Sequence, residues 1–147
     1  MQFPLLTAIF VTLAGVCIAV QAPINAALGR GVQSPLAAAA ISFGIGFVLL
    51  TLGTLAMGQG RAFLRAVSAD WWMWTGGVLG AFYVWTMVWS LPRLGTLTAL
   101  CALALGQIIA AILLDRIGAF GLPVRDLSIP RLLAALMVGG GLILSRF

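Results

Sequence analysis

The stretch LGTLTALCALALGQIIAAILL (residues 94–114) decides the fold class, because it contains no charged side chain. A helix needs roughly 20 consecutive apolar residues to cross a bilayer, and this stretch is long enough. Outward from it, the charges of the chain leave four more uncharged runs, at residues 1–29, 31–60, 71–92 and 132–145. The last run is short, but Arg131 and Arg146 can extend their charged ends to the lipid headgroups.

The composition supports the same class. Of the 147 residues, 63% are hydrophobic and 7% are charged, whereas soluble domains carry about 25% charged residues. The sequence therefore predicts an all-α integral membrane protein, a single domain with five transmembrane helices and an uncleaved first span. We expect the spans at about residues 4–28, 34–57, 71–91, 94–115 and 128–146.

Several residues predict where these helices begin and end. Ser34 is the expected N-cap of the second span, with Pro35 at the following position. The third span should stop at Pro92. Residues 59–70 form the most polar connection, and a short helix lying at the membrane surface is expected there. The tryptophans that follow predict an aromatic belt at one membrane face; they are Trp71, Trp72 and Trp74.

The charges also exclude several functions. The net charge is +5, but the basic residues are all arginines scattered singly at span ends, where they anchor helices rather than bind nucleic acid. There is no histidine, and Cys17 and Cys101 lie within spans without metal-site partners, so we expect packing cysteines, no metal and no cofactor. With no nucleophile–base or carboxylate pair in view, we expect no enzyme.

The first span carries the most informative polar residues. Gln21 and Asn25 are four residues apart and share one helix face. Pro23 lies between them, removes a backbone donor and predicts a kink. Transporters use broken helices of this kind to bind substrate, but amides also hold neighbouring helices together. The sequence favours neither interpretation.

Further polar and aromatic residues within the spans are candidates for binding, since polar groups in hydrocarbon are costly. Each has a structural alternative: contact between helices for Gln107, packing or lipid contact for Tyr83 and Trp85, and a headgroup charge for Asp115. The candidate substrate-binding residues are Gln21, Asn25, Tyr83, Trp85, Gln107 and Asp115.

Small residues predict close helix packing. Glycines spaced four apart or clustered let helix backbones approach each other in lipid. The positions concerned are Gly76, Gly80, Gly139 and Gly140.

The distribution of arginine predicts the orientation only weakly. With five spans, the N-terminal side holds five arginines and the other side holds three, so the N-terminus is expected in the cytoplasm. Such a small bias is typical of a protein that inserts both ways, and also of an ordinary protein with one topology. In an antiparallel dimer, the partner's Asp115 would lie beside Gln21 and Asn25, on the same side of the membrane.

Two stretches resemble a known family. QAPINAALG (residues 21–29) is similar to the first-helix motif, and GQIIAAILLDRIG (residues 106–118) to the fourth-helix motif, of the YdcZ-like branch of the drug/metabolite transporter superfamily. The resemblance implies half of an inverted-repeat transporter with ten helices, in a bacterial inner membrane. Its expected partner is a second copy in antiparallel orientation, or a homologous five-span protein.

One departure from the superfamily limits what the resemblance implies. Its small multidrug exporters use a glutamate in the first helix for proton-coupled export of cations, and this chain has no glutamate. We therefore expect a small-solute transporter with alternating access, working as a dual-topology homodimer, without that coupling residue. The alternative is a membrane assembly or regulatory subunit that transports nothing.

Overall fold

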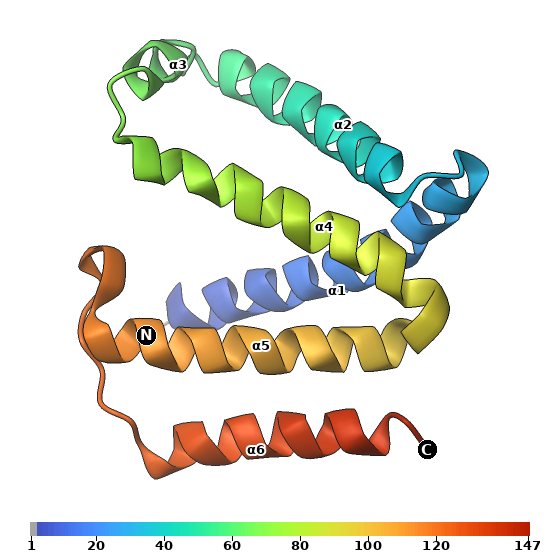
Figure 1. Cartoon of the computed structure of the whole chain (residues 1–147). Helices are drawn as coiled ribbons and strands as arrows, with labels where there is room; N and C mark the ends of the chain where they lie inside the picture. Colours follow the sequence, from blue (N-terminus) through green and yellow to red (C-terminus); the bar gives the residue numbers. More distant parts are fainter. Residues whose placement is uncertain (1–2) are drawn as a thin grey trace. The chain divides into compact units, whose positions relative to one another are not determined.

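A computed structural model describes residues 3–147, which form helices joined by short connections (Figure 1). In chain order the elements are α1 (Phe3–Gly31), α2 (Pro35–Ala56), α3 (Arg61–Ala66), η1 (Trp71–Trp74), α4 (Thr75–Leu94), α5 (Thr96–Ile117), η2 (Ala119–Gly121) and α6 (Ile129–Leu144).

Three of these helices are long and apolar enough to cross a membrane: Leu5–Gly31, Pro35–Ala56 and Thr96–Ile117. α4 has 20 residues, but its glycines, tryptophans and tyrosine make it less hydrophobic. α6 is apolar but has only 16 residues.

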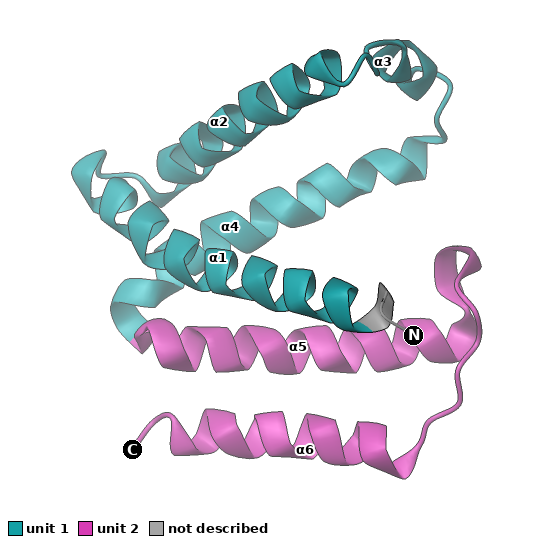
Figure 2. Ribbon diagram, turned by 180° about the vertical axis from the view of Figure 1, so that it is seen from behind, with its two compact units in different colours: residues 1–93 teal, residues 94–147 magenta. Residues whose placement is uncertain are grey.

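The chain divides into two compact units, Met1–Arg93 and Leu94–Phe147 (Figure 2). In the first unit, small and β-branched side chains of α2 and α4 form a buried cluster against α1. Its buried members are Ala38, Ala39, Val84 and Val88, with Leu28 and Tyr83 packed against them.

Gly29 is the point of closest approach in this unit. A Cβ atom at Gly29 would lie 2.8 Å from Cγ1 of Val88 and 3.7 Å from Cβ of Ala38. Only the absence of a side chain lets α1 come this close to α4 and α2, which is how small residues act at helix contacts in membranes.

The turn between α1 and α2 follows the sequence prediction. The hydroxyl of Ser34 accepts a hydrogen bond from the backbone N–H of Ala37 at 3.1 Å, and Pro35 opens the helix, so the predicted N-cap is confirmed. α1 continues to Gly31, beyond the end expected at Leu28.

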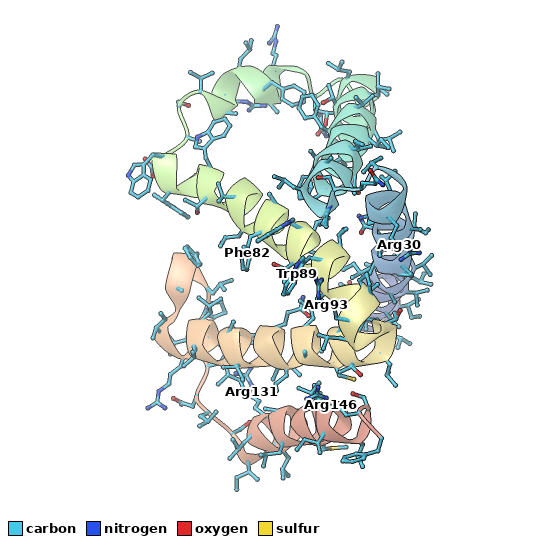
Figure 3. The ribbon with its side chains drawn as sticks, turned by 45° about the vertical axis from the view of Figure 1, so that its right-hand side comes forward. Arg30, Phe82, Trp89, Arg93, Arg131 and Arg146 are labelled. Carbon is cyan, nitrogen blue, oxygen red and sulfur yellow. The ribbon has the colours of Figure 1, made fainter. Side chains whose placement is uncertain are left out.

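The predicted helix end at Pro92 is wrong by two residues, since α4 continues to Leu94. Proline disturbs the turn before it, and here it lies in the last turn, where one lost backbone bond is tolerated. Arg93 adds support there: its guanidinium donates a hydrogen bond to the carbonyl of Trp89 and lies 4.3 Å from the centre of the Trp89 ring (Figure 3).

The short helix expected within residues 59–70 is present as α3, in the connection between α2 and α4. Asp70 precedes η1, whose tryptophans are all exposed. Placement of these elements at a membrane surface stays a prediction.

The second unit is an antiparallel hairpin of α5 and α6, which lie side by side in Figures 1 and 2. At one end, the Thr98 hydroxyl donates to the carbonyl of Ser145 at 3.1 Å, and the Ser145 hydroxyl lies 3.2 Å from that of Thr98. At the other end, Arg131 and Asp115 form an ion pair at 3.1 Å. Polar contacts therefore close both ends of the hairpin.

Gly118 caps the C-terminal end of α5, and its φ of +60° suits glycine at that position. A Cβ there would meet Val124 at 2.8 Å. α6 buries none of its residues in the single chain, and Met137 on it is 76% exposed. The apolar surface of α6 is therefore largely uncovered within the second unit.

Candidate substrate pocket

A small pocket in the first unit brings together polar residues from α1 and α4. Its volume is about 10 Å³, close to the space that one water molecule needs. It is lined by Gln21, Ala22, Asn25, Tyr83, Val84, Met87 and Val88.

Asn25 is the most unusual of these residues, because it is polar and only 7% exposed. Within residues 3–147, the Asn25 side-chain amide forms no hydrogen bond with another group, yet its atoms are not sealed away from the pocket. A buried polar group without a partner costs roughly 1–3 kcal/mol. The amide is therefore available to a molecule that enters the pocket.

A larger groove of about 530 Å³ adjoins this pocket, and both are lined by Gln21, Tyr83 and Val84. α2 supplies its opposite wall. The remaining lining residues are Ile18, Ser42, Phe43, Gly46, Phe47 and Leu50. The pocket and the groove together form one largely apolar site with a few polar groups, which is the usual character of a small-molecule site.

The structure thus brings together three of the residues that the sequence singled out: Gln21, Asn25 and Tyr83. Trp85 does not join them. It is exposed on another face of α4, where its ring lies 6.1 Å from that of Phe82. Helix geometry explains the separation, because residues two apart point to different sides.

The kink predicted at Pro23 stays a prediction. α1 is assigned as one continuous helix through Pro23, which is exposed. Proline nonetheless supplies no N–H to the preceding turn, so the carbonyl of Ala19 lacks its usual donor.

The two candidates on α5 lie in the second unit. Gln107 is exposed. Asp115 is paired with Arg131, both side chains being about 30% exposed, and the pair lies beside a groove of about 210 Å³. Asp115 therefore has a partner within its own chain that sequence reasoning missed.

The four glycines expected at packing positions differ in their surroundings. A Cβ at Gly80 would lie 3.3 Å from Phe43, and one at Gly139 would lie 3.8 Å from Leu105. At Gly76 and Gly140, an added Cβ would have no neighbour within 4 Å among the described residues.

Sequence reasoning also missed the apolar residues that shape the pocket. Val84 and Val88 are four apart, with Met87 beside them, so they form one stripe of α4 that faces α1. That spacing was readable in the sequence. In the part of the chain that the structure describes, no three His, Cys, Asp or Glu residues gather as a metal site would require.

Helices long and apolar enough to cross a membrane, with a few polar groups gathered in a pocket between them, indicate a multi-pass helical membrane protein. Comparison with known families identifies the group within that class. Residues 6–144 match the family described as "Putative inner membrane exporter, YdcZ", and the chain belongs to that family.

A curated relative agrees with this assignment. The chain is 30% identical over 143 residues to the inner membrane protein YdcZ of Escherichia coli (strain K12), covering 96% of this chain and 95% of that protein. No solved structure matches the chain. The protein is a multi-pass inner membrane protein, and the family name supports a membrane transporter.

Proposed function

We propose that this protein transports a small solute, and that Gln21, Asn25 and Tyr83 bind it. The observation that carries the proposal is the buried amide of Asn25, which faces the pocket without a partner. A group of this kind is costly in a membrane unless a ligand or another protein supplies its hydrogen bonds. We also propose, from the sequence alone, that Trp85, Gln107 and Asp115 contribute to substrate binding.

We further propose five membrane crossings in each chain. α4 has 20 residues, or about 30 Å at 1.5 Å per residue, which matches the hydrocarbon core. α6 has 16 residues and reaches about 24 Å, so its flanking arginines must extend to the headgroups. Those arginines are Arg131 near its start and Arg146 after its end.

The proposed working unit is an antiparallel homodimer. An odd number of crossings means that two oppositely inserted copies form an inverted repeat of ten helices, the arrangement that alternating access uses. The bare apolar surface of α6, including Leu136 at 62% and Met137 at 76% exposure, supports a helical partner.

A mixed-solute efflux experiment tests transport. Liposomes containing the full chain would be loaded with a mixture of small neutral and charged solutes, and their loss followed by mass spectrometry. We expect one solute class to leave faster than from empty liposomes, and Asn25→Ala to slow that loss at least tenfold. Gln59→Ala is the matched control, because Gln59 lies in the connection after α2, outside the pocket. Equal efflux from wild type, Asn25→Ala and empty liposomes contradicts the proposal.

A topology experiment separates the transporter from the alternative of a non-transporting subunit. Reporters that are active only inside or only outside the cell would be fused to the C-terminus in parallel strains. Signal from both reporters supports the antiparallel dimer. Signal from one, together with recovery of the protein only in a larger complex, supports the subunit.

A further inference from the structure

Among the described residues, none that lines the groove beside Asn25 carries a charged side chain. The pocket and the groove share one polar edge, and their remaining surface is apolar or aromatic. The polar groups are the amides of Gln21 and Asn25 and the hydroxyls of Ser42 and Tyr83. This lining differs from that of a site built to hold an ion.

Charge balance decides which solute such a lining accepts. An ion that leaves water for this groove would lose its hydration without gaining an opposite charge, and that loss is large. The aromatic rings of Phe43, Phe47 and Tyr83 offer a cation only a modest attraction in return. Asp115, the acidic residue that the sequence singled out, is already paired with Arg131.

The size of the groove and the position of its polar edge further limit the class of solute that it can bind. A volume of about 530 Å³ admits a molecule of one or two rings. Its apolar body would lie against Phe43 and Phe47, and a hydroxyl or amide at one end would reach Asn25 and Gln21. Ser42 would contact the same polar end from α2.

We infer that the solute is uncharged and amphipathic, with an apolar body of one or two rings and a hydrogen-bonding group at one end. This inference rests on the proposed transport function and names its substrate class.

The test uses three probes of similar shape and different charge: tryptophol, which is neutral, tryptamine, a cation at pH 7, and indole-3-acetate, an anion. Binding to the full chain in lipid nanodiscs would be measured by equilibrium dialysis against empty nanodiscs. We expect saturable binding of tryptophol at least tenfold tighter than that of either charged probe.

Variants then locate the binding. Asn25→Leu and Ser42→Ala should each weaken tryptophol binding at least threefold. Thr54→Val is the control, because Thr54 lies on the same helix as Ser42 but outside the groove. Its hydroxyl donates a hydrogen bond to the carbonyl of Leu50. Unchanged binding in both Asn25→Leu and Ser42→Ala overturns the inference.

Two other results also overturn it while leaving transport open. Tighter binding of tryptamine, lost in Asp115→Asn, shows a cation site completed by that carboxylate. Partitioning of all three probes no greater than into empty nanodiscs shows that lipid or a second copy fills the groove. In both cases the efflux experiment above still decides whether the protein is a transporter.

Discussion

The helices of the two units of this chain are held together by different kinds of contact. The helices of the second unit are joined by polar contacts at both ends, Thr98 with Ser145 and Asp115 with Arg131. The helices of the first unit meet through small apolar residues and leave Asn25 without a hydrogen-bond partner in the described chain. Satisfied polar groups stabilise a fold, whereas an unsatisfied one near a cavity is available for binding.

Among the variants that test this contrast, we expect Gly29→Ala in the first unit to change stability the most. Its new methyl group would lie 2.8 Å from Cγ1 of Val88, so either the Val88 side chain must shift or α1 and α4 must separate, at a cost of about 1–3 kcal/mol. All five tryptophans lie in this unit, and their emission during unfolding in detergent reports on it.

Two further variants make that result specific. Gly15→Ala is the control, because a Cβ at Gly15 has no described neighbour within 4 Å. Val88→Ala removes the clashing methyl, so Gly29→Ala should cost less in that background. An equal cost in both backgrounds would refute the close contact.

The second test separates the structural role of Asp115 from its predicted role in binding. Asp115→Asn and Arg131→Gln should each loosen the hairpin by about 0.5–1 kcal/mol, as expected for a partly exposed ion pair. Thiol labelling of Cys101 in a Cys17→Ser background follows the second unit alone.

Efflux then decides between the roles. If Asp115→Asn slows efflux while Arg131→Gln does not, the carboxylate contacts solute. Similar slowing in both variants shows that the ion pair acts by holding the hairpin. Arg125→Gln serves as the control, because it removes a nearby exposed arginine.

The smallest expected effect is at the other end of the hairpin. Thr98→Val keeps the shape of the side chain and removes its hydrogen bonds to Ser145, at a cost of about 0.6 kcal/mol, the average measured inside membranes. Faster thiol labelling of Cys101 would report this loss of stability. Thr96→Val, which changes an exposed threonine two residues earlier, should show no such increase.

The helices themselves were largely predictable from sequence, because their ends depend on local chemistry. Charges mark the ends of the long runs, and Ser34 caps α2 as expected. Pro92 was misjudged because a proline near the end of a helix disturbs little of it.

Contacts between helices were harder to predict. Asp115 and Arg131 are joined across the connection at residues 118–128, whose path no periodic pattern specifies. Gly29 was named within a motif, but its contact with Val88 depends on how α1 and α4 cross. Gln21, Asn25 and Tyr83 were found because polar residues within apolar spans are rare, while Trp85 was grouped with Tyr83 although their helix faces differ.

The pocket contains a residue that spectroscopy can observe by itself. Tyr83 is the only tyrosine in the chain, and it lines both the pocket and the groove. A fluorinated tyrosine incorporated there would give one ¹⁹F resonance for each distinct environment of the pocket. Two protomers in identical surroundings yield a single line, whereas a dimer with one pocket open and the other closed yields two.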